Sequence, residues 1–250
     1  MRKITIAGKE VELYDSIDDM PIKRFHRYNK YLIVDSGVGA DISNADNHIE
    51  RAMRFIKQNP THALQELENL RQCLYLVQQE ISPKHWAFAV LVKSIDGKEQ
   101  DDISDEGLKK VIETLGGTTI SETDHIMDSV KKKIDEELAT YFPTLFDDAD
   151  VKEYYGDLRH RTLLLLDEII SGKSNKEEID KITAMLITFT KPQIFWGKES
   201  VEVQYDKQFE NMCLLLSQKV NISPKIMTVL EYYNAFMFLK EQQKNERKRK

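Results

Sequence analysis

The spacing of apolar residues along the chain predicts a mainly helical protein. Apolar residues recur every three or four positions in successive segments, which is the period of a helix with one buried face. Pro21 falls in the first turn of the first such segment, a position that suits proline. The main helices are expected near residues 20–35, 61–81, 122–142, 149–171 and 175–190.

Two stretches alternate apolar and polar residues instead, which is the period of a strand. Ile4, Ile6, Val11 and Leu13 flank an Ala-Gly-Lys-Glu turn and predict a β-hairpin over residues 1–14. A comparable alternation after a second Gly-Lys-Glu turn predicts another hairpin over 194–203. The fold class is therefore mainly α, a multi-helix body with one or two short β-hairpins. A hairpin this small is not stable alone, so it must dock on helices or on a partner.

Three segments carry more specific expectations about burial. Residues 86–92 are continuously apolar, and so are the four leucines 163–166, so both are predicted to lie in deeply buried helices. In the helix over 61–81, apolar residues alternate steps of four and three, as in a short heptad seam. That seam consists of Ala63, Leu67, Leu70, Leu74, Val77 and Ile81.

An acidic segment with turn residues, 96–107, is the best candidate for a surface loop. It lacks the residue order of an EF-hand, so a solvated loop is expected there and not a calcium site. We interpret residues 1–250 as a single mainly helical unit, with this loop as the place of a subdivision if there is one.

The C-terminal region is expected to form two helices, near 205–220 and 224–243, separated by an Asn-Ile-Ser-Pro break. The second helix is apolar nearly all the way round, so its own domain and a neighbouring chain must cover it. Phe236 and Phe238 are expected to point to opposite sides. The residues predicted to make interactions are Tyr232, Phe236, Phe238, Leu239, Lys248 and Arg249.

Charge is divided unevenly along the chain. The net charge is −6, but the last eleven residues hold six Lys or Arg and two Glu, a net +4, so the rest carries −10. An acidic body is a poor match for general duplex binding, which needs basic residues spread over one face. The tail could still contact nucleic acid, but an acidic protein surface is the favoured acceptor. A solvated, frayed helix end is the alternative.

The residue types that carry chemistry do not form a recognisable site. Six histidines are scattered singly, and His48-Ile49-Glu50 has the H-x-E of a zinc deaminase without the required P-C-x-x-C. Gly37-Val38-Gly39 follows a helix and lacks a Walker lysine, so it is read as a helix end. Cys73 and Cys213 lie in apolar helical patterns and are expected to be buried free thiols. We expect no catalytic residues, no metal and no cofactor.

The opening residues lack the apolar run of a signal peptide, and no stretch approaches the length that spans a bilayer. Synthesis in a reducing cytoplasm and no membrane partner are the expectations that follow.

Two stretches resemble proteins of tailed bacteriophages. The opening, MRKITIAGKEVELYDSIDDMPIKRFHRYNKYLIVDSGVGADI, is similar to the start of small structural and assembly proteins, most like those of crAss-like phages that infect Bacteroides. The closing stretch, FENMCLLLSQKVNISPKIMTVLEYYNAFMFLK, resembles the helix, Ser-Pro, helix ending of phage tail-assembly and virion proteins. The resemblance implies a virion structural protein of the tail or head-tail connector, made in the host bacterial cytoplasm. It implies no catalytic residues.

The implied partners are further copies of the chain, in a homo-oligomeric ring, and other virion proteins. Subunits of a closed ring bury different faces on each neighbour, which suits a protein with surplus apolar helix. Two alternatives stay open: a tail-assembly chaperone that is absent from the finished particle, and an accessory protein for packaging nucleic acid.

Overall fold

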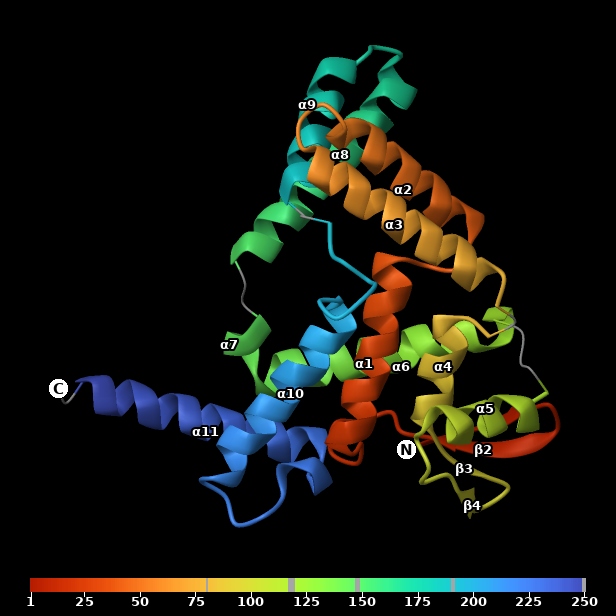
Figure 1. The fold of residues 1–250 in the computed structure, drawn as a ribbon, viewed down its shortest axis with the longest axis vertical. Helices are drawn as coiled ribbons and strands as arrows, with labels where there is room; N and C mark the ends of the chain where they lie inside the picture. Colours follow the sequence, from red (N-terminus) through yellow and green to blue (C-terminus); the bar gives the residue numbers. More distant parts are fainter. Residues whose placement is uncertain (80, 117–119, 147–148, 190–191, 249–250) are drawn as a thin grey trace.

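The computed structural model describes residues 1–79, 81–116, 120–146, 149–189 and 192–248. Helices dominate it, which confirms the predicted mainly α class (Figure 1). The helices are α1 (Ile22–Gly37), α2 (Ile42–Phe55), α3 (Pro60–Val77), α4 (Pro83–Leu91), α5 (Asp105–Thr114), α6 (Ile120–Tyr141), α7 (Pro143–Phe146), α8 (Ala149–Ser171), α9 (Lys176–Phe189), α10 (Val201–Ser217), the 3₁₀ turn η1 (Pro224–Ile226) and α11 (Val229–Lys248).

One antiparallel sheet holds four strands in the order β1 (Arg2–Ile6), β2 (Lys9–Leu13), β3 (Val92–Ile95) and β4 (Lys98–Glu99). The predicted N-terminal hairpin is confirmed, and it docks inside the chain because Val11 of β2 pairs with Ile95 of β3. Part of the acidic segment, expected to be a loop, forms the second hairpin. Asp96 and Gly97 both have positive φ there, 50° and 77°, as in the two-residue turns that join twisted strands.

The predicted hairpin over 194–203 is wrong. Residues 192–199 contain no strand, and α10 begins at Val201 after Ser200, whose hydroxyl accepts a hydrogen bond from the Val203 N–H. An apolar residue of this segment packs in a core instead, because Phe195 is buried beside Val38 and Cys73. Its ring lies so close to Gly37 that a Cβ there would meet a ring carbon at 2.0 Å, so a larger residue at this position would have to displace the ring.

The main core lies between the sheet and helices α1, α4, α5, α6, α10 and α11. As predicted, the apolar run of α4 is central, and residues 87–91 are all buried. The buried faces of α1 and α10 supply Phe25, Tyr28 and Leu216 to the same core. Both cysteines are buried free thiols, as expected, with Cys213 in this core and Cys73 in a smaller one at the ends of α1, α2 and α3.

Helix α3 buries only part of the predicted heptad seam. Ala63 of the seam is buried and Leu70 packs against the smaller core, whereas Leu67 and Leu74 are exposed. The other buried residues of α3 are Glu66, Asn69 and Cys73. The reason is that α3 packs against α2, and α2 presents His48 and Arg51 to the carboxylate of Glu66. A polar contact therefore selects which side of α3 faces inward.

The four leucines 163–166 do not lie in a deeply buried helix, so that prediction is also wrong. Leu163, Leu165 and Leu166 are exposed on α8. Helix α8 instead turns its half-buried face towards α9, where Arg161 Nε donates to Thr183 Oγ1 at 2.9 Å. The α8–α9 pair stands at the same end of the molecule as α2 and α3, away from the sheet (Figure 1).

Candidate functional site

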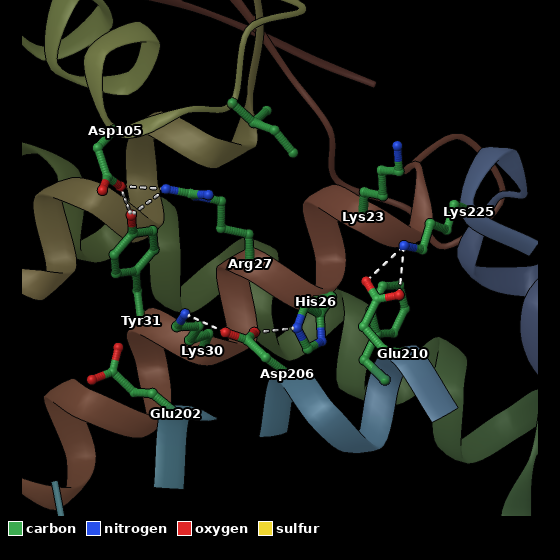
Figure 2. A pocket seen from close by; sticks show the side chains of 12 residues that line it. Lys23, His26, Arg27, Lys30, Tyr31, Asp105, Glu202, Asp206, Glu210 and Lys225 are labelled. Carbon is green, nitrogen blue, oxygen red and sulfur yellow. Dashed lines mark hydrogen bonds and ion pairs between the residues drawn. The ribbon is translucent and has the colours of Figure 1, made fainter. Parts of the chain in front are cut away.

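A charged groove of about 580 Å³ lies where α1 crosses α10 (Figure 2). We call it the charged groove. The residues that line it come from α1, the segment that leads into α5, the first residue of α5, α10 and η1: Lys23, His26, Arg27, Lys30, Tyr31, Ile103, Asp105, Glu202, Asp206, Phe209, Glu210 and Lys225.

Two stripes of opposite charge build this groove. On α10, Glu202, Asp206 and Glu210 are spaced four residues apart and therefore share one face of the helix. On α1, the basic residues at 23, 27 and 30 form the matching stripe. Both stripes are visible in the sequence, but only the packing of α1 on α10 shows that they face each other.

His26 lies at the centre of the contact between α1 and α10. Its ring is stacked between Tyr205 and Phe209, with ring centroids 4.4 and 4.1 Å away. His26 Nε2 lies 2.8 Å from a carboxylate oxygen of Asp206. Burial lowers the pKa of His26, so at neutral pH the ring is uncharged and Nε2–H donates to Asp206.

Asp206 joins His26 to a lysine on the next turn of α1. Its second oxygen accepts a hydrogen bond from Lys30 Nζ at 2.7 Å. Burial alone would raise the pKa of Asp206, but hydrogen bonds from Lys30 and His26 bring it below the usual range. Asp206 is therefore ionised at neutral pH and fastens α10 to α1.

The ends of the groove are closed by similar contacts. Arg27 and the Tyr31 hydroxyl both donate to Asp105 of α5, and burial raises the pKa of Tyr31 to about 12. At the other end, Lys225 Nζ of η1 lies 2.6 Å from Glu210. Burial also raises the pKa of Glu202, which Figure 2 shows without a dashed contact.

The contacts in this groove hold α1, α5, α10 and η1 together. Among the groove's described lining residues, none is a serine, threonine or cysteine that the His26–Asp206 pair could activate. In the described part of the chain, no three His, Cys, Asp or Glu side chains are grouped to hold a metal ion. The four basic and four acidic residues that line the groove balance each other, so it carries no net charge.

The interaction residues predicted near the C-terminus differ in how far they are exposed to solvent. Tyr232 is buried in the main core, so its side chain serves the fold and is not free to meet a partner. Phe236 and Leu239 are half-buried, and Phe238 is exposed over 58% of its surface. Lys248 is the last residue of α11, and Arg249 lies outside the described residues.

The largest exposed apolar side chains gather on helices that the sequence suggested would be covered. On α8 they form a strip along one side, in which Ile169 and Ile170 are 79% and 84% exposed. We call this the α8 strip; its members are Tyr155, Leu163, Leu166, Ile169 and Ile170. Helices α2 and α3 add exposed Ile42, Met53, Ile56, Leu64, Leu67 and Leu74. The sequence reveals these apolar faces but not that they remain uncovered.

Comparison with known proteins finds no family model, no curated relative and no solved structure that matches the chain. Among the described helices, none combines the length and apolar character needed to cross a bilayer.

Proposed function

We propose that this protein is a structural subunit of a larger assembly and acts through protein–protein contacts. The kind of assembly we propose is the one implied by the resemblance of the two terminal stretches: the tail or head-tail connector of a tailed bacteriophage. Its partners in this proposal are further copies of the chain and other virion proteins. It is placed in the virion after synthesis in the bacterial cytoplasm.

The α8 strip is the observation that carries the proposal. Several large aliphatic side chains on one side of a single helix face solvent, although burying each would contribute roughly 1.5–3 kcal/mol. Exposed Arg159 and Thr162 interrupt the strip after Tyr155, but from Leu163 to Ile170 it is contiguous apolar surface, which marks contact sites in soluble proteins. The opposite edge of α8 carries Glu153, His160, Asp167 and Ser171, so the apolar strip has a defined polar border.

Helix α11 supports the same proposal independently. Its first turns pack on the core through Tyr232, Tyr233, Met237 and Leu239, and its remaining turns project away from the body (Figure 1). Phe238 lies at the start of this projecting part with its ring exposed. A helix that leaves its own domain in this way can reach a neighbouring molecule.

A tail-assembly chaperone is the alternative that the same surface favours, because a chaperone also covers a partner with apolar helices. The two differ in where the protein is found. A structural subunit is present in purified particles in stoichiometric amounts, and a chaperone remains in the lysate. Quantitative mass spectrometry of purified particles therefore decides between them.

Sedimentation velocity of the purified chain tests the contact surface itself. Leu163→Asp with Ile170→Asp places two carboxylates in the α8 strip and should abolish self-association, or binding to the particle, without unfolding the chain. The matched control is His160→Asp with Ser171→Asp, which adds the same two carboxylates to the polar edge of the helix. If both double variants associate like the wild type, the α8 strip is not a contact surface.

A further inference from the structure

A second groove, of about 550 Å³, lies on the opposite side of α1 from the charged groove, between α1 and α6. We call it the acidic groove. Four aspartates line it, at positions 35, 124, 128 and 135, against two lysines, at 84 and 131. Leu32, Ile33 and Met127 supply an apolar part of its wall. The groove therefore combines negative charge with an apolar surface.

Two of these aspartates have no cation of their own. Lys84 pairs with Asp124 at 3.7 Å, and Lys131 pairs with Asp135 at 2.6 Å. No ion pair joins Asp35 or Asp128 to a basic side chain in the described residues. Burial raises the pKa of Asp35, which is the behaviour of a half-buried carboxylate whose charge is incompletely compensated.

The wall of the acidic groove also contains an unsatisfied hydroxyl. Tyr28 is only 1% exposed, and its hydroxyl oxygen has no hydrogen-bond partner within the described chain. The phenol lies near Asp128 and Asp135, and after burial these two carboxylates are the further causes that raise its pKa. A buried polar group without a partner costs about 1–3 kcal/mol, so a ligand that donates to this oxygen would recover that free energy.

We propose that the acidic groove binds the basic C-terminal segment, residues 238–250, of a second copy of this chain. This inference rests on the proposed function and names the partner of one of its contacts. The segment's Lys and Arg side chains would meet Asp35 and Asp128, with an ammonium or guanidinium group donating to the Tyr28 hydroxyl.

Composition makes the segment and the groove complementary. The last eleven residues carry a net charge of +4, and the groove has two carboxylates in excess of its lysines. Phe238 is exposed immediately before the basic residues, and the groove offers Leu32, Ile33 and Met127 as an apolar surface for it. A metal ion is a poorer occupant, since no described group of three His, Cys, Asp or Glu side chains can hold one.

The direction of α11 makes the contact intermolecular. The helix projects away from the body, and its C-terminal end lies well away from α1 and α6, which overlap near the middle of the view (Figure 1). The tail of one copy therefore reaches the groove of another, which leaves the first copy with a free groove and the second with a free tail. Such head-to-tail contacts build a ring when the rotation closes and a filament when it does not.

The first experiment measures binding of a labelled peptide, residues 238–250, to the full-length chain by fluorescence anisotropy. Because the contact is mainly electrostatic, we expect binding at about 50 mM salt and its loss at about 0.5 M. Asp35→Asn with Asp128→Asn should weaken binding roughly tenfold, equivalent to two modest ion pairs. The matched control, Asp46→Asn with Asp180→Asn, removes two exposed carboxylates on α2 and α9 and should leave binding unchanged.

Tyr28→Phe separates binding from folding. Because the hydroxyl has no partner in the free chain, its removal should leave the melting temperature equal or higher while weakening peptide binding several-fold. A lower melting temperature with unchanged binding would mean that the hydroxyl serves the fold, which overturns its role in the site.

The second experiment tests that the contact joins two copies. One variant has a reversed groove, Asp35→Lys with Asp128→Lys, and the other has a neutralised tail, Lys244→Glu with Lys248→Glu, which lowers the net charge of the last eleven residues from +4 to 0. Both also carry Leu163→Asp and Ile170→Asp, so that the α8 strip cannot associate. Each alone should sediment as a monomer at low salt, and the mixture should form a 1:1 heterodimer through one intact tail and one intact groove.

Absence of the heterodimer overturns the inference, as does a tail peptide that binds a DNA duplex more tightly than it binds the chain. If the two groove variants associate as well as the wild type, but the α8 strip variant does not associate, only the tail–groove contact is refuted. The proposed function then remains supported. The proposed function would instead be refuted if mass spectrometry did not find the chain in purified particles.

Discussion

Replacing Glu66 with Gln tests the most unusual feature of the core, a carboxylate buried where the sequence favoured a leucine seam. Glu66 is 0% exposed on α3, and its Oε2 lies 2.8 Å from Nδ1 of His48 on α2. His48 Nε2 lies 3.1 Å from the carbonyl oxygen of Val38, so both ring nitrogens face oxygen atoms of other residues. Arg51 Nη2 lies 2.9 Å from Oε1.

The expected loss follows from what Gln retains. Its amide oxygen can still accept one hydrogen bond, but the charge opposite His48 and Arg51 disappears. Arg51 is a third exposed and can turn to water, and it is not aligned as a hydrogen-bond donor to Oε1, so most of the effect comes from buried His48. Breaking a buried pair costs roughly 3–5 kcal/mol, and we expect the lower end, about 3 kcal/mol.

Urea unfolding followed by circular dichroism measures the free energy of unfolding, and hydrogen exchange shows where it is lost. Because α2 and α3 rest on a small core of their own, increased exchange should appear first within residues 42–77. The control is Glu68→Gln on the same helix, whose ion pair with Arg71 is exposed and 3.8 Å long, and it should change stability by less than about 0.5 kcal/mol. Equal effects of the two substitutions would refute a stabilising role for buried Glu66.

Three further substitutions test other parts of the structure. Leu13→Ala, at a fully buried position in β2, should lower the free energy of unfolding by about 2–5 kcal/mol in urea titrations, and exposed Thr5→Ala should not. Burial lowers the pKa of His26, so as the pH drops the unfolded chain takes up this proton before the folded chain does, and the free energy of unfolding should decrease below about pH 6.5. Between pH 7.5 and pH 5, the melting temperature of His26→Gln should therefore decrease less than that of the wild type. Phe238→Glu should leave the free energy of unfolding within about 0.5 kcal/mol of the wild type but reduce the oligomers seen in sedimentation. A loss of stability as large as that of Leu13→Ala would mean that Phe238 is part of the core.

Local patterns in the sequence predicted the elements well because the signals for starting, ending and turning a chain are local. Helix α8 has the predicted bounds, and α4 begins at Ser82-Pro83, where Ser82 and His85 form a capping box. The N-terminal hairpin was predicted for the same reason. The hairpin of β3 and β4 was missed because its Asp-Gly turn lay in an acidic segment read as a loop, and pairing with β2 is a long-range contact.

The charged groove could be predicted only in part. Its acidic stripe on α10 has a regular spacing of four, and the basic stripe on α1 has steps of four and three, but nothing local indicates that these helices cross. The stacking of His26 between Tyr205 and Phe209 likewise joins residues about 180 positions apart. Sequence spacing shows which side chains share a face, and tertiary packing alone shows which faces meet.

The same limit explains the leucines of α8 and gives their exposure its meaning. Apolar periodicity predicts that one face of a helix is buried. It does not show whether that face is buried by the same chain or by another one. Residues 86–92 and 163–166 are equally apolar in sequence, yet the first run is enclosed by the sheet and its helices and the second faces solvent. If a second chain covers the α8 strip, the expectation of burial was correct for the assembled protein and incorrect only for the single chain.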